Sequence, residues 1–185
     1  MPKALPTLAA QRNQSGELMR QLAQSDKKLR NIPRRKRALA RWAAGFAGLR
    51  FLQQEGERYA HWKIPVHAHM VEGGQTTPEL QAFCIQQLIT AAQHLIDEAT
   101  QHPPQGALRV ACLIIWPYLH QSEVTIFYDP DYYQGFINTP TPLLRSDLSR
   151  QLDLNIPHDW QVIGVDVTQP DDDQAVTWWV VGQPL

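Results

Sequence analysis

Two histidines, His67 and His69, stand two residues apart, and on a strand this spacing directs both side chains to one face, as a metal pair requires. A zinc site needs three or four ligands. No Cys-x-x-Cys, no His-Glu-x-x-His and no third clustered ligand accompanies this pair. We therefore interpret the two histidines as part of a solvated loop after a strand, and the sequence predicts no metal site.

Other patterns that support catalysis are equally weak in this sequence. Gly73 and Gly74 lack the lysine and the strand-loop-helix spacing of a phosphate-binding loop, and no Gly-x-Ser-x-Gly nucleophile motif occurs. His120, Ser122 and Glu123 are close in sequence, but they suit the polar start of a hairpin better than a catalytic triad. We therefore expect a protein that is not an enzyme, with no catalytic residue and no cofactor.

The distribution of charge is the clearest functional signal from the residues themselves. Residues 1–50 carry twelve Lys and Arg against two acids, and the other 135 residues carry five against sixteen. Two basic runs resemble sequences that neutralise phosphates, and they contain Lys27, Lys28 and Arg30, then Arg34, Arg35, Lys36 and Arg37. These residues either contact nucleic acid or pair with the acidic remainder of the chain, and the sequence leaves both readings open.

Aromatic and acidic residues gather in a second region, which we interpret as a candidate binding surface for a protein partner. Exposed tyrosines flanked by carboxylates suit a protein partner, especially a basic one. The alternative is that two or three of these rings cover the core. The candidate residues are Tyr128, Asp129, Asp131, Tyr132, Tyr133, Phe136 and Asp147.

Length and composition predict one soluble folding unit. A chain of 185 residues with 43 % hydrophobic residues and six Trp is long enough and apolar enough to bury a core. Cys84 and Cys112 lie in apolar stretches and predict no disulfide. No apolar run has the length of a signal peptide or a membrane span, so we expect a cytoplasmic protein. We divide it into a basic helical arm, residues 1–55, docked on a body, residues 56–185.

Periodicity predicts the helices. Polar helical spacing covers residues 16–31, and an apolar stripe opposite arginines covers residues 33–49. The strongest helix begins at Thr77 and ends at residue 102, because a Thr cap, a Pro and an acid precede a long repeat of apolar residues. The spacing of leucines in residues 143–152 predicts a short helix there.

The strands are predicted by alternation and by turns. Residues 59–66 contain a Pro and suit the edge of a sheet, whereas residues 108–116 are apolar on both faces and suit its centre. Residues 124–128, 162–167 and 175–181 complete the set, and residues 129–142 are expected to form a loop. This order predicts an α+β fold, a mainly antiparallel sheet with helices packed on one face, preceded by a basic helical N-terminal arm.

The chain also resembles a bacterial family of uncharacterised proteins, the domain-of-unknown-function family 3916. The resemblance covers most of the body and excludes residues 1–25. It rests on the order and spacing of short segments, which are Lys27-Lys28-Leu29-Arg30, Ile32-Pro33-Arg34-Arg35, Tyr59-x-x-Trp62-Lys63-Ile64-Pro65, Gln75-Thr76-Thr77, Cys84-Ile85-Gln86-Gln87-Leu88-Ile89, the strand that leads into Pro117, and Ser122-Glu123-Val124.

The resemblance implies no activity that transfers residue by residue. Small proteins of this kind, with varied loops and no active site, look like the immunity proteins encoded beside antibacterial toxins in polymorphic toxin systems. By this analogy we expect an immunity protein that binds a cognate toxin domain and occludes its active site. The alternative is an RNA- or DNA-binding module that uses the basic N-terminal helices.

Overall fold

The computed structural model describes residues 32–48, 56–66, 77–101, 108–116, 118–137, 154–168 and 175–183, with backbone alone for residues 135–137, 163–168 and 175–179. The predicted helices at residues 16–31 and 143–152 lie outside these residues. So do His67, His69, Asp147 and the first basic run, Lys27 to Arg30.

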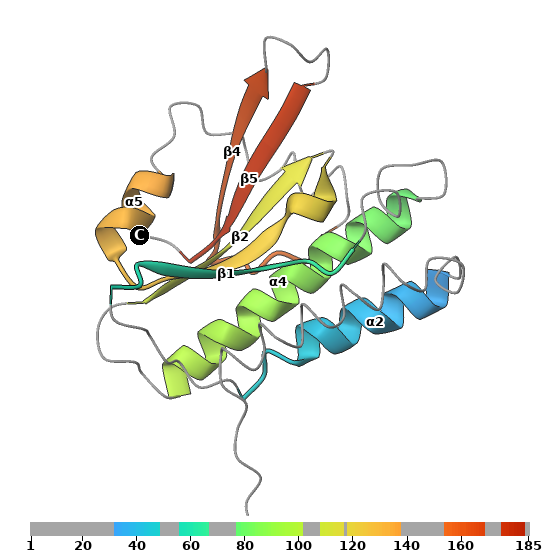
Figure 1. Ribbon diagram of the computed structural model, residues 1–185, viewed down its shortest axis with the longest axis horizontal. Helices are drawn as coiled ribbons and strands as arrows, with labels where there is room; N and C mark the ends of the chain where they lie inside the picture. Colours follow the sequence, from blue (N-terminus) through green and yellow to red (C-terminus); the bar gives the residue numbers. More distant parts are fainter. Residues whose placement is uncertain are drawn as a thin grey trace, which may run out of the picture.

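A five-stranded antiparallel sheet forms the centre of the fold, in the order β1-β3-β2-β5-β4 (Figure 1). Its strands are β1 (Tyr59–Lys63), β2 (Arg109–Trp116), β3 (Glu123–Phe127), β4 (Gln161–Thr168) and β5 (Ala175–Gly182). A short 3₁₀ turn, η1 (Leu119–Gln121), joins β2 to β3. The α+β class, the edge position of β1 and the central position of β2 are confirmed.

Helix α4 (Pro78–Gln101) covers one face of the sheet, as its apolar repeat predicts. Its start is fixed by Thr77, whose Oγ1 accepts the N–H of Leu80 at 3.2 Å and whose carbonyl accepts the N–H of Gln81 at 3.0 Å. Leu88 and Leu95 are fully buried between the helix and the sheet. Capping and burial therefore specify this helix together.

Helix α2 (Ile32–Ala44) lies beside α4 and shares its core (Figure 1). The rings of Trp42 and Phe46 pack edge to face at 5.0 Å, and Phe46 packs edge to face on Trp62 of β1 at 5.5 Å. After α2 the chain turns at Gly48, whose positive φ of 73° favours glycine and whose N–H binds the Glu98 carboxylate of α4 at 2.7 Å. The apolar stripe of α2 therefore docks it on the body.

Helix α5 (Pro130–Ile137) occupies a segment that we expected to be a loop, so that prediction is wrong. Asp129 accepts the N–H groups of Asp131 at 3.0 Å and Tyr132 at 3.2 Å through Oδ1, and Pro130 fits the first turn of a helix. The Asp-Pro pair thus starts a helix instead of a turn. Eight residues are too few for a helical repeat to be recognised in the sequence.

A second, smaller core lies under α5, on the sheet face opposite α4. Its buried residues are Ala111, Phe127, Tyr133 and Val180, with Leu113 packed against them. The Tyr133 hydroxyl donates a hydrogen bond to the Gln183 carbonyl at 2.6 Å, which ties α5 to the end of β5. Helices therefore pack on both faces of the sheet, α4 on one and the short α5 on the other, whereas the sequence predicted helices on one face.

Both cysteines are free and buried, one in α4 and one in β2. Burial raises the pKa of Cys84 to about 12 and raises the pKa of Cys112 further. Each thiol therefore stays protonated and behaves as a small apolar group. Among the helices that the structure describes, none has the length and apolar character needed to cross a membrane.

Candidate functional site

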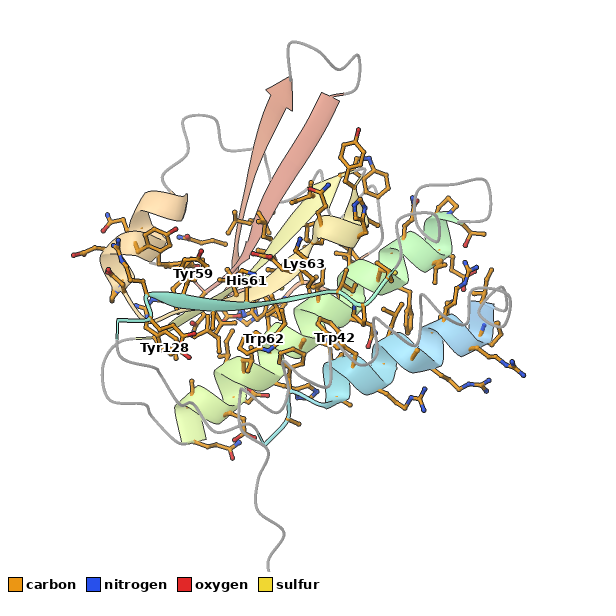
Figure 2. All side chains as sticks on the ribbon, viewed as in Figure 1. Trp42, Tyr59, His61, Trp62, Lys63 and Tyr128 are labelled. Carbon is orange, nitrogen blue, oxygen red and sulfur yellow. The ribbon has the colours of Figure 1, made fainter. Side chains whose placement is uncertain are left out.

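The alternation of β1 exposes a polar and aromatic row on the α5 side of the sheet. Tyr59, His61 and Lys63 are exposed, whereas Ala60 and Trp62 are buried toward the helices. Figure 2 shows Tyr59, His61 and Lys63 on the side of β1 away from α4. Across the strand pair this row lies opposite Phe127, Thr125 and Glu123 of β3.

Planar groups from β1 and α5 stack on one another at this surface. The Tyr59 ring stacks on Tyr132 with centroids 5.6 Å apart and planes 12° apart, and it stacks on His61 at 5.8 Å and 19°. The Arg58 guanidinium lies 4.7 Å from the Tyr132 ring centroid. Tyr59 and Tyr132 are 43 % and 37 % exposed, the large apolar side chains most open to solvent among the described residues. We call this surface, with its neighbours Glu123, Thr125, Phe127 and Asp129, the tyrosine face.

Asp129 holds the two sides of the tyrosine face together. Its Oδ2 accepts hydrogen bonds from Arg58 Nε at 3.1 Å and Nη2 at 2.9 Å, while Oδ1 caps α5. The backbone N–H of Tyr132 and then the Arg58 guanidinium lower the pKa of Asp129 below its usual value. The carboxylate therefore remains charged near neutral pH and fixes Arg58 and the first turn of α5.

A shallow hollow opens between the stacked rings and β3. It has a volume of about 160 Å³ and is lined by Tyr59, His61, Glu123, Thr125, Phe127 and Tyr132. Pockets for small molecules and cofactors occupy about 300 to 1,000 Å³. The hollow therefore fits one side chain of a partner better than a cofactor.

One carboxylate faces this hollow. Glu123 Oε1 accepts a hydrogen bond from the Thr125 hydroxyl at 3.4 Å, and Oε2 lies 3.9 Å from His61 Nε2. The Glu123 side chain is 16 % exposed, so it is partly shielded from water. Among the described residues, no group of three or more His, Cys, Asp and Glu could hold a metal ion. The hollow can therefore stack a planar group on its aromatic rings and pair a cation with the Glu123 carboxylate.

The predicted partner-binding residues divide into three groups. Asp129 and Tyr132 belong to the tyrosine face, and Asp131 is exposed beside them on α5. Tyr133 is fully buried, which corrects the expectation that it is exposed, and Tyr128 packs partly buried against the larger core. For Phe136 the structure describes the backbone alone, and Asp147 lies outside the described residues.

Sequence reasoning missed the β1 half of this surface, namely Arg58, Tyr59 and His61, together with Glu123 of β3. The alternation of residues 59–63 marks the exposed row, but only the pairing of β1 with β3 brings it beside α5. Arg58 and Asp129 are 71 residues apart in the chain. A pattern read along the sequence contains no signal for a contact of this range.

The second basic run is divided between the two sides of α2. Arg35 is buried, and its charge acts on Cys84 of α4, so it is not open to nucleic acid. Lys36 pairs with Glu79 of α4, lowering the pKa of that carboxyl, and its Nζ lies 5.2 Å from the centroid of the Phe83 ring. Arg34 and Arg37 are exposed.

Comparison with known proteins gives one family. The model of the family described as "Protein of unknown function (DUF3916)" matches residues 40–183, from within α2 to the end of β5. The match includes every residue of the tyrosine face. No curated protein and no solved structure matches the chain.

Proposed function

This chain belongs to the DUF3916 family, and we propose that it binds a cognate antibacterial toxin domain and occludes the toxin's active site, as an immunity protein does. One observation carries the binding role: the two most exposed tyrosines stack beside a hollow that fits one side chain. The toxin as the partner follows from the analogy between this family and immunity proteins.

The order already present in the tyrosine face favours tight binding. Side chains that are immobilised on binding cost about 0.5 to 1.5 kcal/mol each, and tyrosine has few rotatable bonds to lose. Tyr132 is held by the Arg58 guanidinium and by stacking on Tyr59, and the first turn of α5 is held by Asp129. These side chains are therefore already ordered in the free protein, and little further conformational entropy is lost when a partner binds.

The hollow suits an arginine of the partner. A guanidinium stacks on tyrosine rings and forms paired hydrogen bonds with a carboxylate, and here both features, Tyr59 and Glu123, line the same space. In residues 51–185 acidic residues outnumber basic ones, and this negative charge steers a basic surface toward the body. A toxin with a basic active-site cleft meets both requirements.

The proposed role requires that a toxin domain be encoded beside the gene for this chain, and the test uses cells that express that domain. The Tyr59→Ala/Tyr132→Ala double variant is expected to abolish protection, and its melting temperature is expected to stay near that of the wild type. Gln93→Ala, a change at an exposed position of α4, is the control and should protect fully.

Full protection by the Tyr59→Ala/Tyr132→Ala double variant would refute the proposed surface. Protection by far less than one molecule of this protein per toxin would refute occlusion, because a stoichiometric inhibitor cannot act on many toxins in turn.

A further inference from the structure

Helix α2 has an outer face on which, among the described residues, no other element packs. Its inner face carries Leu39, Trp42 and Ala43 into the core, whereas Arg34, Arg37 and Arg41 are exposed. Their spacing of three and four residues places these arginines in one row on the outer face, which we call the arginine stripe. Within the part of the chain that the structure describes, none of the three pairs with a carboxylate.

The arginine stripe is unfavourable for the isolated helix. Like charges three or four residues apart destabilise a helix by a few tenths of a kcal/mol per pair. Arg34 also lies in the first turn, at the positive end of the helix dipole, and that turn contains no acid. Arg35 and Lys36 are directed to α4, so the contacts among the described residues give these two basic side chains a role in the fold and give none to the three of the stripe.

We propose that the arginine stripe binds the phosphodiester backbone of nucleic acid without regard to base sequence. Arginine pairs with phosphate oxygens through two parallel hydrogen bonds and stays charged at every physiological pH. The stripe spans about 10 Å, since a helix rises about 1.5 Å per residue, and one strand of a duplex carries one phosphate per roughly 3.4 Å of axis. Three arginines thus face about three phosphates.

The outer face of α2 lacks the features by which a protein partner or a lipid surface would bind it. Protein interfaces are built around aromatic anchors, but the aromatic residues of this segment, Trp42 and Phe46, are buried. A helix that inserts into a lipid surface presents its apolar face, and that face of α2 is in the core. The other exposed residues of α2 are Pro33, Ala40 and Ala44, small side chains that let a polymer backbone approach closely but read no base.

The test is the salt dependence of binding to fluorescein-labelled 20-base-pair DNA and RNA duplexes, measured by anisotropy with the full chain. Each phosphate contact contributes about 0.9 to the slope of log affinity against log salt. Removing two contacts with Arg37→Gln/Arg41→Gln should reduce the slope by about 1.8. Lys63→Gln/Arg109→Gln removes the same charge from the opposite side of the sheet and is expected to leave the slope unchanged.

A stripe of three contacts predicts that affinity falls roughly fortyfold between 50 and 200 mM salt through these residues alone. Arg37→Lys/Arg41→Lys should keep most of the slope, which shows that charge and not helix stability is being measured. Equal slopes for the two Gln variants would overturn the proposal, and so would the absence of duplex binding at 50 mM salt. Arginine-dependent binding to phosphatidylserine vesicles without binding to either duplex would also overturn it.

Discussion

Two neighbouring tyrosines should behave in opposite ways when removed, because Tyr133 lies in the core and Tyr132 on the surface. Tyr133 is fully buried, and its ring centroid lies 5.0 Å from that of Phe127. Its hydroxyl donates a hydrogen bond to the Gln183 carbonyl at 2.6 Å. Losing the hydroxyl in Tyr133→Phe is expected to lower the free energy of unfolding by about 1 to 1.5 kcal/mol. Tyr133→Ala should lower it by about 3 to 5 kcal/mol, since it empties the space of a large ring.

Thermal melting and toxin binding then separate the two positions. For a chain of this length, 1 kcal/mol corresponds to roughly 2 to 4 °C, so Tyr133→Phe should melt about 2 to 6 °C below the wild type. Tyr132→Ala is expected to change stability by about 1 kcal/mol or less and to weaken toxin binding. A Tyr133→Ala protein as stable as the wild type would refute the placement of this ring in the core.

The same residue predicts a pH effect. Burial raises the pKa of Tyr133 in the folded state, whereas the pKa of this tyrosine in the unfolded chain is about 10. The stabilisation is complete below about pH 10 and declines as pH rises further, because the unfolded chain then loses a proton that the folded chain keeps. Between pH 8 and 11, Tyr133→Phe should therefore lose less stability than the wild type, as measured by denaturant unfolding.

Three further predictions concern the core. Leu88→Ala, at a fully buried position of α4, should lower the free energy of unfolding by about 2 to 5 kcal/mol in denaturant titration; an unchanged midpoint would show that this face is not the core. Gly182→Ala should lower it by about 1 to 3 kcal/mol, since the new Cβ would lie 2.6 Å from the Val110 carbonyl oxygen; a variant as stable as the wild type would contradict the tight β2–β5 contact. Cys84 and Cys112 should resist a thiol reagent at pH 8 until the chain unfolds, and rapid labelling of the folded protein would contradict their burial.

The elements that the sequence predicts correctly are those with local signals. Helix α4 begins at a Thr cap and a Pro and repeats apolar residues over 24 residues, so capping and periodicity agree. Strand β2 is apolar on both faces because α4 covers one face and the core under α5 covers the other. The prediction of an α+β fold with an antiparallel sheet depends on such elements and is confirmed.

The tyrosine face was only half predictable. The aromatic and acidic composition of residues 128–136 points to Tyr132 and Asp129, but it does not separate Tyr132 from the buried Tyr133. In a helix of eight residues, neighbouring positions lie about 100° apart, so adjacent tyrosines face different surroundings. The contribution of Tyr59 depends on pairing between strands far apart in the sequence, and this is fixed by the whole sheet.

The most direct measurement of the proposed role is a calorimetric titration of the toxin domain into the wild type and into Tyr59→Ala and Tyr132→Ala. The proposed occlusion predicts one toxin per molecule of this protein. It also predicts that each tyrosine variant loses about 2 kcal/mol or more of binding free energy, a roughly thirtyfold or larger increase in Kd. A Kd unchanged in both variants, with one-to-one binding intact, would contradict the claim that the tyrosine face holds the partner.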